Sequence, residues 1–135
     1  PQSDLLRALV LLWHDHLDEA HQIVQDLPGA DAAFIHAIMH RREPDYWNSK
    51  YWWRRVGEHP AFTELTRRAG ERLSDDDRSP LKSRLLPRGV WDPFAFVDAC
   101  EEAAGRGGSV EQRQLLRALQ QLESETLLAH LCASG

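Results

Sequence analysis

SDLLRALVLLWHDHLDEAHQIVQDLPGADAAFIHAIMHRREP, residues 3–44, is the stretch that decides the fold of this chain. Its apolar residues recur every three or four positions, which is the period of an amphipathic α-helix. Ser3 has the side chain of a good helix N-cap, and Pro28-Gly29 is a strong stop signal. We therefore expect one long helix from Ser3 to about Leu27.

A second helix is expected directly after this stop. Asp31 is a suitable N-cap, and the helix should end at about Arg42, because Pro44 disfavours helical backbone in the residue before it. The connection at residues 28–30 is short, and short connections between helices usually give antiparallel neighbours. The stretch therefore predicts a long antiparallel helical hairpin.

The rest of the chain also has the pattern of helices. Asp92 followed by Pro93 is a clear helix start, and Ser109 is a suitable cap for the last helix. Loops are expected at residues 74–79 and 105–108, and the further helices at 45–56, 61–73, 81–86 (a single turn), 92–104 and 109–131. The prediction is an all-α fold, a single-domain irregular bundle of about five to six helices over residues 1–135.

Length and composition agree with this class. A chain of 135 residues with 42% hydrophobic residues suits one soluble globular domain. The longest apolar run, residues 8–13, is too short to cross a bilayer, and no secretory pattern opens the chain. Cys100 and Cys132 are expected to be two reduced thiols, with a single disulfide as the alternative. We therefore expect a cytoplasmic protein with no membrane partner.

The charge is unevenly distributed. The net charge of -5 argues against a nucleic-acid partner. Residues 41–88, however, carry twelve Lys or Arg against eight acids, a local net charge of +4. This segment could attract a small anion, or its bases could pair with acids of neighbouring helices. A homodimer would also suit an acidic helical domain.

Two groups of polar side chains share a four-then-three spacing: His14, Asp18 and His21 in the first helix, and His36, His40 and Glu43 in the second. On a helix this spacing places each group along one face. Folding the hairpin should bring His21 beside His36, and His14 and Asp18 to the level of His40. The two groups would then form one site.

Imidazole and carboxylate are ligands of Zn, Fe, Ni or Mn, and histidines on facing helices can bind such ions within a bundle. The predicted metal ligands are His14, Asp18, His21, His36 and His40. The predicted catalytic residues are His14, Asp18 and His40, supported by Glu43. Two alternatives remain: metal-free acid-base catalysis by His and Asp, and histidines that are structural residues at the helix boundaries.

The expected reaction is hydrolysis or proton transfer on a small anionic substrate. The predicted substrate-binding residues are Arg42, Trp47, Tyr51 and Arg54, because Arg donates forked hydrogen bonds to anions and aromatic rings supply a flat wall. The alternative is that these aromatic residues pack in the core while the arginines pair with acids. The competing class of protein is a non-catalytic helical binding or interaction module.

Several features lie outside the predicted site. His16 and His59 are expected to be structural, with His59 a helix cap or a surface residue, and His130 is expected to favour the dipole at the end of the last helix. The chain has no Gly-rich phosphate loop, no GxSxG elbow and no zinc-finger cysteine spacing. His14-Asp15 matches part of the HD phosphohydrolase pattern, but no histidine precedes it in the chain.

Three runs carry a resemblance to known proteins: HDHLDEAHQIVQD (14–26), HAIMHRREPDYWNSKYWWRRVGEHPAF (36–62) and WDPFAFVDACE (91–101). They are similar to a family of small uncharacterised helical proteins of bacteria and fungi. The similarity covers most of the chain, and the central run is its most specific part. The resemblance brings no activity or ligand with it, and implies only that the chain is a self-contained unit.

Overall fold

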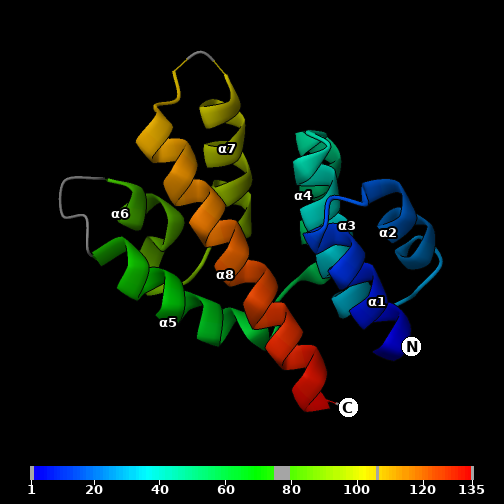
Figure 1. Cartoon of the computed structure of the whole chain (residues 1–135). Coiled ribbons are helices and arrows are strands. Elements are labelled where there is room, and N and C mark those ends of the chain that lie inside the picture. The colour runs from blue at the N-terminus through cyan, green and yellow to red at the C-terminus, as the bar shows by residue number, and fades with distance from the viewer. Residues whose placement is uncertain (1, 75–79, 106, 135) are drawn as a thin grey trace. The chain divides into compact units, whose positions relative to one another are not determined.

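The computed structural model describes residues 2–74, 80–105 and 107–134. Within these ranges the chain forms eight α-helices and one 3-10 turn, and no strand (Figure 1). The elements are α1 (Gln2–Trp13), α2 (Leu17–Val24), α3 (Ala30–Arg42), α4 (Tyr46–Val56), α5 (Ala61–Ser74), α6 (Leu81–Leu85), η1 (Pro87–Gly89), α7 (Pro93–Ala104) and α8 (Val110–Ser134). The all-α class is confirmed, whereas five to six helices was too few.

The predicted loops, the two cysteines and the membrane prediction are considered for the same described residues. Residues 75–79 of the predicted loop and residue 106 of the predicted break lie outside the described residues. No disulfide joins Cys100 and Cys132, so the prediction of two reduced thiols is confirmed. None of the helices in the described part of the chain is both long and apolar enough to cross a lipid bilayer.

Contacts between residues divide the chain into two compact units. The first unit comprises Pro1–His59 and Leu128–Gly135, and the second comprises Pro60–Leu127. The last helix, α8, contributes residues to both units. A single domain over residues 1–135 stays a prediction, and the two units are described separately below.

The predicted long first helix is wrong, because the chain turns between α1 and α2 (Figure 1). Asp15 adopts a left-handed backbone conformation with φ of 66°, which Asp tolerates better than most residues. The N–H of His16 donates to Leu11 O at 2.8 Å, and that of Asp15 to Leu12 O at 3.1 Å, the pattern that terminates many helices. Arg42 of α3 then binds both Leu12 O and the Asp15 carboxylate.

The centre of the first unit is α3. Ten of its thirteen residues are buried, so it is enclosed on all sides where an ordinary surface helix buries one face. It contacts α1, α2 and most extensively α4. Ser49 of α4 donates to Ala37 O at 2.7 Å, and the rings of Phe34 and Trp53 meet edge to face at 4.9 Å. These contacts hold α3 and α4 in fixed register.

The start of α3 also differs from the prediction. Asp31 was expected to be the N-cap, but the helix begins at Ala30 and its N-cap is Gly29. Gly29 has φ of 99°, a conformation that suits glycine and lets the chain enter α3 directly from the loop. The Asp31 carboxylate therefore lies inside the first turn, where it is available for other contacts.

The second unit has its own apolar core, formed by α5, α6, α7 and the first part of α8. Its buried residues include Leu65, Leu85, Trp91, Phe96 and Leu119. Both predicted caps are confirmed: Asp92 accepts from the N–H groups of Phe94 and Ala95, and Ser109 accepts from that of Gln112. These caps fix where α7 and α8 begin.

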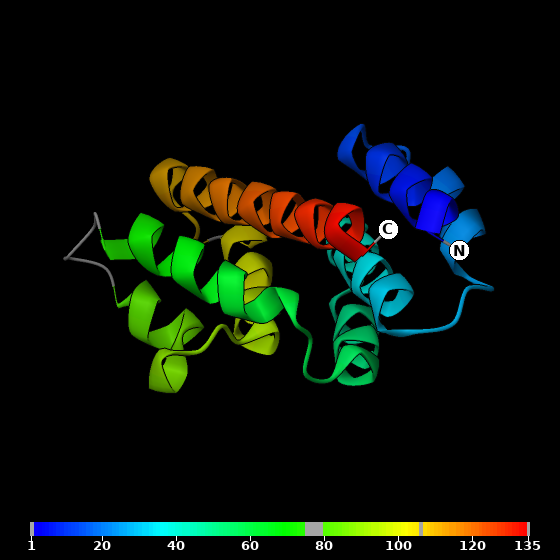
Figure 2. The same cartoon turned by 90° about the horizontal axis from the view of Figure 1, so that it is seen from below.

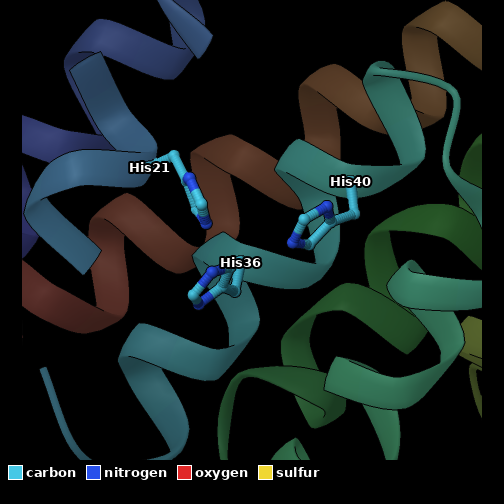
Figure 3. Close-up of side chains that lie close together, drawn as sticks. All are labelled: His21, His36 and His40. Carbon is cyan, nitrogen blue, oxygen red and sulfur yellow. The ribbon is translucent and has the colours of Figure 1, made fainter. Parts of the chain in front are cut away.

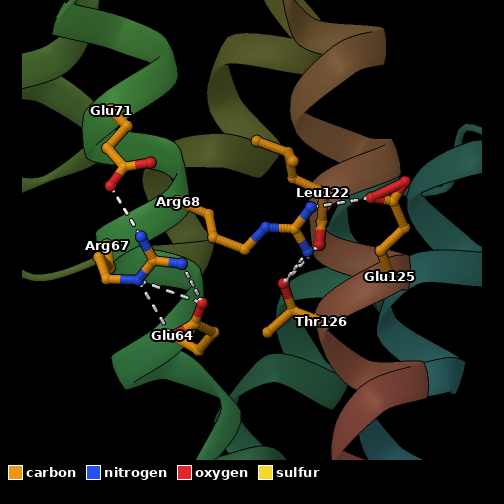
Figure 4. A network of polar contacts seen from close by, with 7 residues as sticks. All are labelled: Glu64, Arg67, Arg68, Glu71, Leu122, Glu125 and Thr126. Atoms are coloured by element: carbon orange, nitrogen blue, oxygen red, sulfur yellow. Dashed lines mark hydrogen bonds and ion pairs between the residues drawn. The ribbon is translucent and has the colours of Figure 1, made fainter.

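Ion pairs cover the surface of this unit where α5 and α8 lie side by side (Figures 2 and 4). Arg68 of α5 reaches Glu125 at 3.0 Å and Thr126 at 3.3 Å on α8. Arg67 bonds to Glu64 and to Glu71 within α5. Part of the basic segment at residues 41–88 is thus neutralised by acids, the alternative to anion binding that the charge pattern left open.

We predict that Asp92→Ala lowers the free energy of unfolding by about 1 kcal/mol. The reason is that two N–H groups of the first turn of α7 lose their acceptor. Urea unfolding followed by circular dichroism measures the change. Glu101→Ala, an exposed site in the same helix, is the matched control, and an equal loss in both variants would contradict the capping role.

Candidate metal centre

Three histidines converge in the first unit. His21 comes from α2, and His36 and His40 come from successive turns of α3 (Figure 3). The ring centroids are 5.0 Å apart for His21 and His36, 5.6 Å for His21 and His40, and 5.2 Å for His36 and His40. One ring nitrogen from each residue lies within 4.8 Å of the other two. Such a group could hold a metal ion.

Local structure explains this convergence. His36 and His40 are four residues apart on one helix, so their rings stack with an interplanar angle of only 6°. His21 approaches both rings edge-on, at 70° and 72°. The short connection between α2 and α3 places it there, as the hairpin argument predicted for His21 and His36.

Burial keeps the two histidines of α3 in the neutral form that binds metals. His36 is 3% exposed and His40 is 7% exposed. Desolvation, followed by the neighbouring His40 and His21, lowers the pKa of His36 to about 4. Desolvation also lowers the pKa of His40, although Glu43 and Asp45 act in the opposite direction. Both rings are therefore uncharged near neutral pH.

Two carboxylates lie beside the ring of His40, although its buried Nδ1 atom has no hydrogen bond of good geometry. Its Nδ1 atom lies 3.1 Å from Glu43 Oε1 and 4.0 Å from Asp45 Oδ2. Many metal-binding histidines have a carboxylate beside the ring nitrogen that does not bind the metal. With Nδ1 turned to Glu43, Nε2 is the nitrogen that can serve the three-histidine group.

A tryptophan connects the group to an open recess. The ring of Trp52, in α4, stacks on His36 at 3.8 Å with an interplanar angle of 7°. Trp52 also lines a recess of about 540 Å³ together with Arg55 and residues of the α2–α3 connection. The guanidinium of Arg55 lies 5.5 Å from the centre of the Trp52 ring. Trp52 thus contacts His36 and also lines the recess, whereas none of the three histidines lines the recess itself.

The structure brings together only some of the residues predicted for the site. His14 and Asp18 are exposed and lie outside the three-histidine group, and Arg42 instead binds the end of α1. Trp47 is 74% exposed, and Tyr51 and Arg54 are exposed on the same helix. Their roles in catalysis or substrate binding stay predictions.

Sequence reasoning missed Trp52. Tryptophans lie on several sides of α4, so its sequence does not show which of them faces α3. Asn48 and Ser49 mark the two sides: the Asn48 side chain bonds to Asp45 at the exposed start of the helix, whereas Ser49 is fully buried against α3. The small residue Ser49, which allows close approach of α4 to α3, was the signal in the sequence. Trp52 follows it by three residues and therefore lies on the same side of the helix.

A second group of potential ligands was also missed. Asp31, His59 and His130 each offer one ligand atom, and these atoms lie within 4.8 Å of one another. The prediction that His59 is a surface residue is wrong, because it is only 5% exposed, and its alternative role as a helix cap stays a prediction. The three residues are far apart in the sequence, and no helical spacing relates them.

No match to the chain is found among models of protein families, among curated proteins or among solved structures. The chemistry of the two groups therefore carries the functional argument.

We predict that acid destabilises the protein through His36. The unfolded chain takes up a proton near pH 6.5, whereas folded His36 does so only near pH 4. Stability should therefore fall as the pH drops from about 7 to 4, by on the order of 3 kcal/mol from this residue, and level off below.

Urea unfolding with a chelator present, repeated between pH 7 and pH 4, measures this loss. His36→Gln should flatten the pH dependence, and exposed His16→Gln should leave it unchanged. Equal slopes for the wild type and His36→Gln would show that His36 is not the responsible group.

Proposed function

We propose that His21, His36 and His40 bind one divalent transition-metal ion, and that the protein uses it for hydrolysis or proton transfer on a small anionic substrate. The observation that carries the proposal is the convergence of three ring nitrogens within 4.8 Å. Imidazole suits Zn, Fe and Ni, and also accepts Mn.

The dimensions suit such an ion. With metal–nitrogen bonds of about 2.0–2.1 Å, tetrahedral ligand nitrogens stand about 3.3 Å apart. The nitrogens of the group must therefore close by at most about 1.5 Å. His21 is only partly buried and comes from a different helix from the other two, so its ring can make most of this movement.

Three protein ligands leave a coordination position for a water or a substrate atom, as in catalytic rather than structural zinc sites. A metal bound in this way lowers the pKa of such a water to about 7 and polarises substrate oxygens. Glu43 lies 3.1 Å from His40 Nδ1 and would be the carboxylate behind this ligand. Glu43 and Asp45 also place negative charge beside the group, which favours a bound cation.

The substrate would lie in the recess beside Trp52. Arg55 supplies a cation with forked donors, which suits a carboxylate or a phosphate, and the Trp52 ring supplies a flat wall. Arg54 and Tyr51 of the same helix remain candidates for contacts at its edge. A non-catalytic metal-binding module is the alternative, and activity measurements separate the two.

We predict that the purified chain binds Zn²⁺ and that His21→Ala removes one bound equivalent, lowering its affinity by at least about 100-fold. At a free Zn²⁺ concentration of 100 times the Kd of this site, the bound ion should raise the free energy of unfolding by about 2.7 kcal/mol. Calorimetric titration and thermal melts with and without a chelator measure both effects. His16→Ala is the control, because His16 is exposed and pairs only weakly with Glu19 at 3.5 Å. Wild-type zinc binding by both His21→Ala and His36→Gln would refute the site.

We predict metal-dependent hydrolysis when small phosphate and carboxylate esters are screened with Zn²⁺, Mn²⁺, Ni²⁺ or Fe²⁺. For a substrate that is turned over, Arg55→Ala should raise KM about tenfold or more with little change in kcat, because it removes binding to the anionic part. His36→Gln should abolish kcat. Lys82→Ala, in the second unit, is the control. Metal binding without any turnover would favour the non-catalytic alternative.

A further inference from the structure

We propose that Asp31, His59 and His130 form a second metal site, which takes a divalent first-row transition metal and fastens the end of α8 to α3 within the first unit. The three residues come from the first turn of α3, from the segment after α4, and from α8. This site does not depend on the function proposed for the three-histidine group.

The contacts of one oxygen atom carry this proposal. Asp31 Oδ1 lies 2.6 Å from His59 Nε2 and 3.3 Å from His130 Nε2. The two imidazole rings meet edge to face, with centroids 4.8 Å apart. Both histidines thus direct the same ring nitrogen toward one carboxylate oxygen. The three ligand atoms lie within 4.8 Å of one another, so one metal ion could replace the hydrogen bond between His59 and Asp31 and bind all three.

The surroundings suit a built site better than a chance surface contact. His59 is almost completely buried, and its ring packs edge-on against Phe34 at 5.0 Å. Asp31 and His130 are partly exposed, so an ion can enter from that side. Two imidazoles with one carboxylate suit Zn or Fe(II), whereas Mg and Ca prefer sites built from oxygen ligands alone.

The second site is separate from the three-histidine group, although both use α3. Asp31 and His36 are five residues apart, which corresponds to roughly 140° around a helix. The ion would therefore lie on a different side of α3. It would connect residues 31 and 130, which are 99 positions apart in the chain, near the point where the Gln2 side chain also donates to Leu131 O.

Asp31→Asn is the variant that tests the site without disturbing the fold. The amide oxygen of asparagine still accepts the hydrogen bond from His59, but it is neutral and a much weaker metal ligand. His130→Ala removes a second ligand at a partly exposed position. His21→Ala is the matched control, because it removes a ligand of the other group and leaves this one complete.

The experiment titrates the full chain with Zn²⁺ by calorimetry, and with Co²⁺ by absorption spectroscopy. The wild type should bind two equivalents. Asp31→Asn and His130→Ala should each lose one of them, with at least about a 100-fold drop in affinity, and should keep the equivalent that His21→Ala removes. Thermal melts with zinc should show a smaller stabilisation for Asp31→Asn than for the wild type.

The results with a single bound equivalent separate the two proposals. A single equivalent that is lost in His21→Ala but kept in Asp31→Asn would overturn the second site and leave the proposed function standing. A single equivalent that is lost in Asp31→Asn but kept in His21→Ala would support the second site and overturn the three-histidine centre. Wild-type binding in Asp31→Asn and His130→Ala, or no binding by the wild type, would overturn the second site.

Discussion

The burial of α3 on all sides is the constraint on which the first unit depends. An enclosed helix must satisfy each polar side chain from neighbouring elements, because water cannot do so. The α3 helix nevertheless carries His36 and His40 in its interior. The surrounding helices α2 and α4 cover these rings with His21 and Trp52, and Glu43 at the C-terminal end of α3 itself lies beside His40. The candidate metal centre is thus a product of the way α3 is covered.

The turn between α1 and α2 serves the same arrangement. A continuous helix through residues 14–16 would fix the direction of His21 by that of α1. The left-handed Asp15, bound by Arg42 from the end of α3, ends α1 and releases α2 to take its own direction. Arg42, expected to hold a substrate anion, instead couples the far end of α3 to this turn. The ion pair between Arg42 and Asp15 thus lies at the turn from which α2 carries His21 toward His36.

Features that depend on residues close together in the sequence were predicted well, and features that depend on distant residues were not. Helices at residues 46–56, 61–74 and 93–104 were predicted closely, because apolar period, caps and stop signals are local. The stacking of His36 and His40 is likewise a consequence of helical spacing. The break at Asp15 was missed, and Arg42, which binds this turn, lies 27 residues away in the sequence. His14 and Asp18 were grouped with His21 on the assumption of an unbroken helix.

The sequence by itself determined the all-α class, most helix boundaries and the pairing of His36 with His40, because each depends on residues a few positions apart. Only the tertiary structure decided that Trp52 stacks on His36, and that Asp31, His59 and His130 meet. Those meetings depend on how one element packs against another. No periodicity or spacing within a single segment predicts these contacts, because the residues that meet belong to segments far apart in the sequence.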